Sequence, residues 1–449
     1  MSAERSVRAA PERASERHRA LVEELDVAAR ELGVLSPEQA IEGELAIRDL
    51  RRKRRRAAED PLGMLTLTEV DGVLLWSEGA AGPPALAGRR RRRAAVSGAP
   101  EGEVVAQYRF PRLGANQVSS FLEDLDRKLT PHQGLRVWRD GMLKPVERPA
   151  ASMQRALLFV HGTFSSNDHM LEELTSTEHG RAFLERAAKH YDGIYAFDHP
   201  TLSVSPTINA FELSRSFADV RAQVDVVAHS RGGLVARWWL EGFGGAGVGP
   251  RRAALVGSPL GGTSLASPAR LRASMSMLTN IGSALRIAGA GASSVAPFLS
   301  VPVAILRVVT SITSFAAKTP AFDAAIAMVP GLACQSRVRN NAEIAALRRA
   351  RVSPRPEYFA VISDFEPEDV RWRFWQRFRK TSLADGAADW LFDGQNDLVV
   401  DTPSMTELSE TPFPADRLLD FATNPRVHHV NYFRQEETLA HLAKWFAMN

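Results

Sequence analysis

The strongest constraint on the fold is a series of short apolar runs that recur in the second and larger part of the chain. These runs are Ala156–Val160, Gly193–Phe197, Val224–Ala228, Ala253–Gly257 and Tyr358–Ile362. Apart from Asp225, the runs consist of apolar residues, glycine and tyrosine, which is typical of strands covered by helices on both faces of a parallel sheet. Segments with helical patterns, 180–190, 211–221 and 232–242, separate the earlier runs. We therefore predict one α/β domain over residues 151–449, with a mainly parallel central sheet and right-handed crossovers.

The composition and the ends of the chain narrow the class of protein further. Of the 449 residues, 45% are hydrophobic and 24% charged, which excludes wholesale disorder, a collagen-like repeat and a disulfide scaffold. Cys334 is the only cysteine, so no disulfide can form within the chain. The amino-terminal sequence is charged throughout and does not resemble a secretory signal. We expect a cytoplasmic protein, with peripheral contact to a membrane as an alternative.

Residues 1–150 carry no recognisable catalytic constellation and are predicted to form a small α+β accessory region. Helical spacing covers residues 16–58, a hairpin is expected around Asp71-Gly72, and a further strand over 103–110. Two basic runs, 51–56 and 89–93, stand out against a net charge of only +4. They fit a solvated helix end and a loop, or contact with an anionic membrane surface. Because no nucleic-acid-binding motif accompanies them, we predict no specific nucleic-acid partner.

The sharpest chemical signal is the segment Val226–Val235, in which an apolar strand runs into Ser230 and a helix-like stretch follows. A serine on such a tight turn sits in strained backbone, so the residues two before and two after it must be small. Ala228 and Gly232 satisfy that requirement, although glycine is commoner at the first position. The turn would place the hydroxyl above the sheet, at the positive end of the following helix. The pattern predicts that Ser230 is a nucleophile.

A second segment, Phe159–Phe164, also ends a buried strand and would lie at the same edge of the sheet. A tetrahedral intermediate requires two backbone N–H donors, and we predict that Thr163 and Arg231 supply them. We expect His161 to hold this loop rather than act as a base. For the side chain of Arg231 we expect a salt-bridging position at the surface.

Together these residues resemble the α/β-hydrolases of the bacterial lipase and esterase type. The matching segments are Val160–Thr163, Ala228–Gly233 and Gly257–Thr263, with further segments near the carboxyl end. The resemblance covers about the last two-thirds of the chain and leaves residues 1–150 unexplained. It implies an α/β-hydrolase fold and an esterase or lipase activity.

The resemblance also implies that an acid and then a histidine follow the nucleophile along the chain. The acid is expected at Asp397, which lies in an Asn-Asp pair followed by apolar residues, with Asp393 and Asp401 as alternatives. For the base, the histidine-any-asparagine pattern of such lipases selects His429, with its neighbour His428 as the runner-up.

Two further segments bear on the substrate. Residues 264–350 are poor in acidic residues and rich in small and apolar ones, which predicts a helical cap or lid over the active site, or a plain helical subdomain. Residues 371–380 mix aromatic and basic side chains, as in an interfacial membrane segment or a packed helix.

The sequence therefore predicts a serine hydrolase for carboxylic esters, preferably of acyl lipids. The alternatives are an acyltransferase, thioesterase or phospholipase that uses the same residues, and a non-catalytic interaction protein with this fold. No cluster of ligating residues has a metal-binding spacing, so neither a metal nor a cofactor is predicted.

Overall fold

The structure is a computed structural model, and it describes most of the chain. The described residues are 18–31, 62–78, 102–111, 113–246, 251–267, 271–287, 292–313, 329–338, 340–368, 374, 392 and 394–448. The two basic runs, Asp393 and nearly all of 371–380 lie outside these ranges.

The main element of the fold is an eight-stranded sheet with the strand order β11-β10-β9-β8-β6-β7-β4-β5, called the large sheet below. Its strands are β4 (Gly134–Arg139), β5 (Met142–Pro145), β6 (Arg155–Val160), β7 (Gly193–Asp198), β8 (Gln223–His229), β9 (Arg252–Val256), β10 (Glu357–Phe365) and β11 (Leu418–Asn424). The strands from β6 to β11 pair in parallel, whereas the β4–β5 hairpin runs antiparallel at one edge. The five apolar runs of the sequence are β6 to β10, which confirms the predicted mainly parallel sheet.

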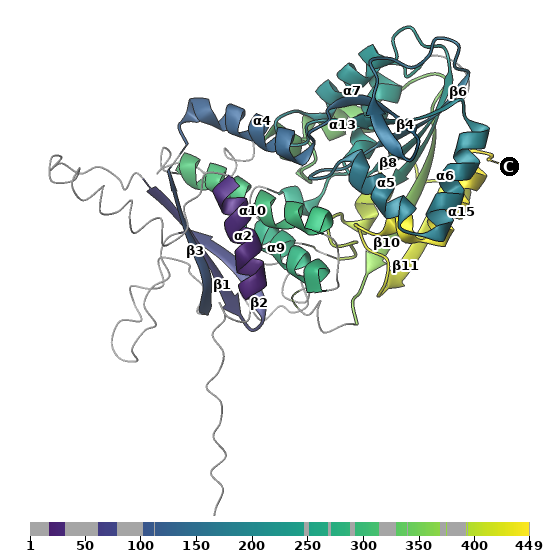
Figure 1. Cartoon of the computed structure of the whole chain (residues 1–449). Helices are drawn as coiled ribbons and strands as arrows, with labels where there is room; N and C mark the ends of the chain where they lie inside the picture. The colour runs from purple at the N-terminus through teal and green to yellow at the C-terminus, as the bar shows by residue number, and fades with distance from the viewer. Residues whose placement is uncertain are drawn as a thin grey trace, which may run out of the picture.

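Helices cover both faces of the large sheet (Figure 1). One face packs against α7 (Pro206–Ser216) and α8 (Gly232–Arg237), and the other against α5 (Asn167–Thr175), α6 (Glu178–His190) and α15 (Glu436–Trp445). Neighbouring residues of β8 divide between the two layers, since Val226 belongs to the first core and Val227 to the second. Because both faces are buried, the strands need no polar alternation. This architecture confirms the predicted α/β-hydrolase fold.

A second, smaller body is built from the amino-terminal region and the insertion after β9. Its three-stranded sheet, here the small sheet, has the order β2-β1-β3, with β1 at Leu62–Val70, β2 at Val73–Glu78 and β3 at Glu103–Pro111. The predicted hairpin is confirmed, and its turn residues Asp71 and Gly72 both have positive φ, at 52° and 81°. Helix α2 (Arg19–Glu31) and two helices of the insertion, α9 (Leu271–Ile287) and α10 (Ala292–Thr313), share one apolar core with the small sheet.

The structure differs from the sequence-based expectations at two places. Strands β4 and β5 belong to the large sheet although they precede residue 150, and their turn at Asp140-Gly141 is a hairpin signal that the sequence analysis did not use. Helix α7 ends at Ser216 rather than near residue 221, because it begins earlier, with Pro206 in its first turn. The remaining short helices are α4 (Val118–Leu129), α12 (Pro330–Ala333) and α13 (Ala342–Arg349).

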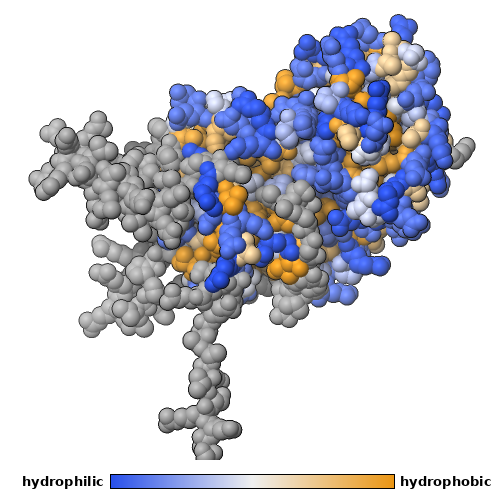
Figure 2. All heavy atoms as spheres, in the orientation of Figure 1, coloured by the Kyte–Doolittle hydropathy of each residue, from blue (hydrophilic) through white to orange (hydrophobic). Residues whose placement is uncertain are grey.

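The described surface is mainly hydrophilic on the face that Figure 2 shows, with smaller hydrophobic areas between the polar ones. Among the described residues, no helix combines the length and the apolar character that crossing a bilayer would require.

Candidate active site

Ser230 lies on a sharp turn between β8 and α8 and is 5% exposed. Its φ of 53° falls in the left-handed region, which residues other than glycine rarely adopt. Its backbone N–H donates to the carbonyl of Val256 at 2.8 Å. Gly232 is required here, because a Cβ atom at this position would come within 2.3 Å of the Val160 carbonyl oxygen. The turn therefore has the strained geometry that the sequence around Ser230 predicts.

The loop after β6 passes directly beside this turn. A Cβ atom on Gly162 would lie 2.7 Å from the Cβ of Ser230, so only glycine allows the approach. His161 is buried under the loop, where its Nδ1 faces the Gly162 carbonyl at 2.8 Å and its Nε2 accepts from the His199 backbone at 3.0 Å. Burial lowers the pKa of His161, which disfavours the charged form of the ring.

The two amides predicted to bind an oxyanion, those of Thr163 and Arg231, flank Ser230 on these two loops. Within the described part of the chain neither amide donates a hydrogen bond to the protein. The Thr163 hydroxyl is fixed by the side chain of Gln335, whose Nε2 donates to it at 2.9 Å. Thr163 also lines the cavity next to Ser230, whereas Arg231 is fully buried.

The side chain of Arg231 does not lie at the surface, and that expectation is wrong. It is fully buried, and its Nη2 donates to the carbonyl of Val204 at 2.6 Å. Burial lowers the pKa of this guanidinium to about 10. The side chain is directed inward, toward the loop that includes Val204. A carboxylate from the amino-terminal region holds this loop in place.

That carboxylate is Asp126 on α4, a residue that the sequence analysis did not single out. It is buried and accepts hydrogen bonds from the backbone N–H groups of Thr201, Leu202 and Ser203, at 2.7–3.1 Å, and from the Ser203 hydroxyl at 2.6 Å. Thr201 in turn accepts from the backbone of Phe164, next to Thr163, at 3.4 Å. Asp126 thus supports the loop that carries one of the two candidate oxyanion donors.

Asp397 and His429 are joined as the sequence-based assignment requires. Nδ1 of His429 lies 2.8 Å from Oδ2 of Asp397, which is fully buried. The other carboxylate oxygen, Oδ1, accepts from the backbone N–H groups of Val399 and Val400 at 3.1 and 2.8 Å. With Nδ1 bound to the acid, the Nε2 edge of the imidazole is left for proton transfer.

Two residues missed in the sequence complete this arrangement. The hydroxyl of Tyr432 donates to Oδ2 of Asp397 at 2.9 Å, and burial raises the pKa of the phenol well above its ordinary value. Nε2 of His229 lies 2.9 Å from the backbone carbonyl of His429, and burial lowers the pKa of His229 to about 3. Tyr432 lies three residues after His429, and His229 directly precedes Ser230. Both residues therefore adjoin the motifs that identify the base and the nucleophile.

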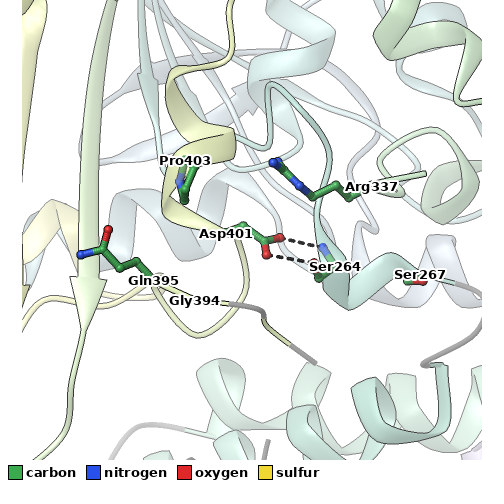
Figure 3. Close-up of a pocket in the computed structure, with 7 residues that line it drawn as sticks. All are labelled: Ser264, Ser267, Arg337, Gly394, Gln395, Asp401 and Pro403. Carbon is green, nitrogen blue, oxygen red and sulfur yellow. Dashed lines mark hydrogen bonds between the residues drawn. The ribbon is translucent and has the colours of Figure 1, made fainter. Parts of the chain in front are cut away.

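The alternatives are placed differently. His428 packs edge-on against the ring of Phe365, and burial lowers its pKa to about 4. Asp401 accepts from the backbone N–H and the hydroxyl of Ser264 at 2.8 and 2.9 Å, and it lines a separate polar cavity together with Arg337 (Figure 3). Asp393 lies outside the described residues. Neither His428 nor Asp401 is among the residues that line the cavity next to Ser230.

This cavity has a volume of about 330 Å³, and Ser230, His429 and Thr163 all line it. The insertion contributes apolar side chains to its lining, which are Met275 and Leu278 of α9, Pro297 and Phe298 of α10, and Leu332 of α12. In the described part of the chain no hydrogen bond joins the Ser230 hydroxyl to the His429 ring. Such bonds are often long before substrate binds. Among the described residues no group of three or more His, Cys, Asp or Glu side chains could hold a metal ion.

Comparisons with solved structures find similarities to bacterial lipases and esterases. The chain is similar to the mature lipase of Bacillus licheniformis, with 15% identity over 67% of this chain and 95% of that one, at a TM-score of 0.37. It is similar to an esterase from a Rhodococcus species (14% identity, 70% and 98% coverage, TM-score 0.35). It is also similar to lipase 1 of Pelosinus fermentans (13% identity, 64% and 99% coverage, TM-score 0.38). No curated protein matches the sequence.

A family model described as "Domain of unknown function (DUF7379)" matches residues 128–447. This range covers more than half of the chain and contains Ser230, Asp397 and His429. The chain therefore belongs to the DUF7379 family.

Proposed function

We propose that the protein is a serine hydrolase that cleaves carboxylic esters through Ser230, His429 and Asp397. One observation carries the proposal: a buried Asp397–His429 pair, 2.8 Å apart, opens onto the same cavity as a serine held at a left-handed turn. This combination of a strained serine, an oriented imidazole and a buried carboxylate is what activation of a hydroxyl requires.

In the proposed reaction, Nε2 of His429 removes the proton of the Ser230 hydroxyl while the oxygen attacks the ester carbonyl. The N–H groups of Thr163 and Arg231 bind the resulting oxyanion. The imidazolium, stabilised by Asp397, then gives its proton to the departing alcohol as the C–O bond breaks, which leaves an acyl group on Ser230. A water molecule then attacks this acyl-enzyme as His429 takes its proton. The tetrahedral intermediate that forms collapses, His429 returns the proton to the Ser230 oxygen, and the carboxylic acid is released.

The hydrogen bonds to Asp397 have a defined role in this scheme. Two backbone amides fix one oxygen of the carboxylate, and His429 and Tyr432 share the other. These four contacts therefore hold the carboxylate in one orientation next to the imidazole. We propose that Tyr432 is a positioning residue that acts through Asp397.

The apolar wall of the cavity supports an acyl substrate. Side chains of α9, α10 and α12 line the cavity together with Ser230 and His429. Its volume of about 330 Å³ suits an ester of moderate length. We propose that the acyl chain lies against this wall and that residues 264–350 act as a cap over it. We also propose that the enzyme prefers esters of acyl lipids and that it contacts a membrane surface.

A fluorophosphonate probe tests the nucleophile directly, because it reacts only with an activated serine. We expect the full-length protein to be labelled and Ser230→Ala to lose labelling, whereas Ser214→Ala, a change at a half-buried serine of α7, should keep it. Equal labelling of the Ser230→Ala variant would refute the proposal.

The base is tested by a pair of adjacent variants. We expect His429→Gln to lower kcat for p-nitrophenyl butyrate by about 10³-fold or more, the loss seen when a triad member is removed. The matched change His428→Gln should leave kcat within about threefold, since this ring does not reach the cavity. The reverse result would assign the base to His428.

A further inference from the structure

Helix α9 has two different faces, and each meets another part of the protein. Met275 and Leu278 point into the cavity that contains Ser230. Ser276, Thr279 and Asn280 lie on an adjoining face and are buried against β2 of the small sheet. Figure 1 shows α9 and α10 between the small sheet and the large sheet.

The polar face of α9 takes the place of a neighbouring strand at the edge of the small sheet. Asn280 accepts from the backbone N–H of Leu74 at 3.1 Å and donates to its carbonyl at 2.7 Å. The hydroxyl of Ser276 accepts from the Trp76 backbone N–H at 3.0 Å, and that of Thr279 accepts from the Trp76 indole N–H at 2.9 Å. These donors are buried, so each would be left unsatisfied if it lost its partner. The contact therefore fixes both the position and the rotation of α9.

The contact also extends directly to the cavity wall. Besides accepting from Trp76, the Thr279 hydroxyl donates to the backbone carbonyl of Met275 at 3.0 Å. Trp76, Thr279 and Met275 thus form a continuous link from the small sheet to a side chain beside Ser230. The second cap helix, α10, packs on α9, on α2 and on β1, and it contributes Phe298 to the same wall.

We propose that the amino-terminal small sheet sets the acyl-chain selectivity of the enzyme, because it holds α9 against the active-site cavity through Ser276, Thr279 and Asn280. These three are positioning residues, since they touch β2 and not the cavity. The proposal rests on the proposed function, because it concerns which acyl groups fit between the cap and Ser230. It also gives residues 1–150, which contain no catalytic group, a role in the reaction.

The test is a comparison of two matched variants at one position. Thr279→Val keeps the shape of the side chain but removes the acceptor for the Trp76 indole, whereas Thr279→Ser keeps the acceptor. The assay measures kcat and KM of the full-length protein for p-nitrophenyl acetate and p-nitrophenyl octanoate. Ser283→Ala is the control, because Ser283 is a buried serine of α9 that makes no hydrogen bond within the described residues.

We expect Thr279→Val to lower the octanoate-to-acetate ratio of kcat/KM by roughly tenfold, mainly through a higher KM for octanoate. Thr279→Ser and Ser283→Ala should keep the ratio of the parent protein. Trp76→Phe, which removes the same bond from the other side, should shift the ratio in the same direction and serves if Thr279→Val does not fold. A general loss of stability would lower the rates for both esters alike and leave the ratio unchanged.

An unchanged ratio in both Thr279→Val and Trp76→Phe, with Ser230 still labelled by the fluorophosphonate probe, would overturn the positioning role alone. Absence of labelling in the parent protein would instead refute the proposed function. The two failures are therefore distinguishable.

Discussion

Replacing Tyr432 by phenylalanine removes one hydroxyl from the buried carboxylate site and changes almost nothing else. The hydroxyl donates to Oδ2 of Asp397 at 2.9 Å, and the phenol remains protonated because burial raises its pKa well above the ordinary value. A hydrogen bond to a charged group contributes about 1.5–3 kcal/mol. We therefore expect Tyr432→Phe to lower the free energy of unfolding by about 2 kcal/mol.

The same change should lower catalysis, because the carboxylate loses one of the two groups that hold Oδ2 toward His429. If the whole of about 2 kcal/mol is lost from the transition state, kcat/KM falls by roughly thirtyfold. Urea unfolding gives the change in stability, and initial rates with p-nitrophenyl butyrate give the change in kcat/KM.

A matched tyrosine separates the two effects. Tyr358 is also buried, and its hydroxyl donates to the Glu241 carboxylate at 2.8 Å, among residues that do not line the active-site cavity. Tyr358→Phe should cost a similar amount of stability and leave kcat/KM within about twofold. Equal kcat/KM values for the two variants would refute the idea that Tyr432 orients the catalytic carboxylate.

Three further predictions follow from single contacts. Gly232→Ala should destabilise the protein by about 1–3 kcal/mol and lower kcat/KM about 100-fold, because its Cβ would lie 2.3 Å from a carbonyl oxygen of β6. Gly394→Ala should be neutral in the same assays, because no atom of the described residues other than its chain neighbours lies within 4 Å of the added Cβ. Asp126→Asn should lower the free energy of unfolding in urea by about 3 kcal/mol or more, since an amide group would face buried N–H donors. The exposed neighbour on the same helix provides its control, because Asp124→Asn should have an effect below about 0.5 kcal/mol. For His428, burial lowers the pKa from 6.5 to about 4, so the unfolded chain binds the extra proton and stability falls as the pH drops between these values. His428→Gln should therefore reduce the loss of stability between about pH 7 and about pH 5 by roughly 2 kcal/mol, and an unchanged pH dependence would contradict the assignment of a buried neutral ring.

The part of the site that could be predicted is the part determined by neighbours in the sequence. The turn at Ser230 needs small residues at fixed positions, so the strand, Gly232 and the following helix identify it without knowledge of the rest of the fold. The parallel strands were equally visible, because burial on both faces leaves a continuous apolar run. Asp397 and His429 could be named only through the resemblance to lipases, since no local rule brings them together.

The contacts that could not be predicted join segments that are distant in the sequence. Asp126 meets the loop of Thr201 across 75 residues, and Leu74 meets Asn280 across 206. The sequence near Asp126 gives no indication of its hydrogen-bond partners. The same holds for Ser276 and Asn280 in α9. The inward turn of Arg231 has the same origin, since its partner at Val204 belongs to a loop shaped from elsewhere.

These long-range contacts also determine how the amino-terminal region can be studied. The small sheet, α2 and the cap helices bury their apolar side chains in one common core, separate from the two cores that flank the large sheet. Removing residues 1–111 would expose that core on α9 and α10, so loss of activity in a truncated chain would report unfolding of the cap and not a role in selectivity. The single-atom changes at Thr279 avoid this ambiguity, because they leave the apolar core intact and alter only the link between β2 and the cavity wall.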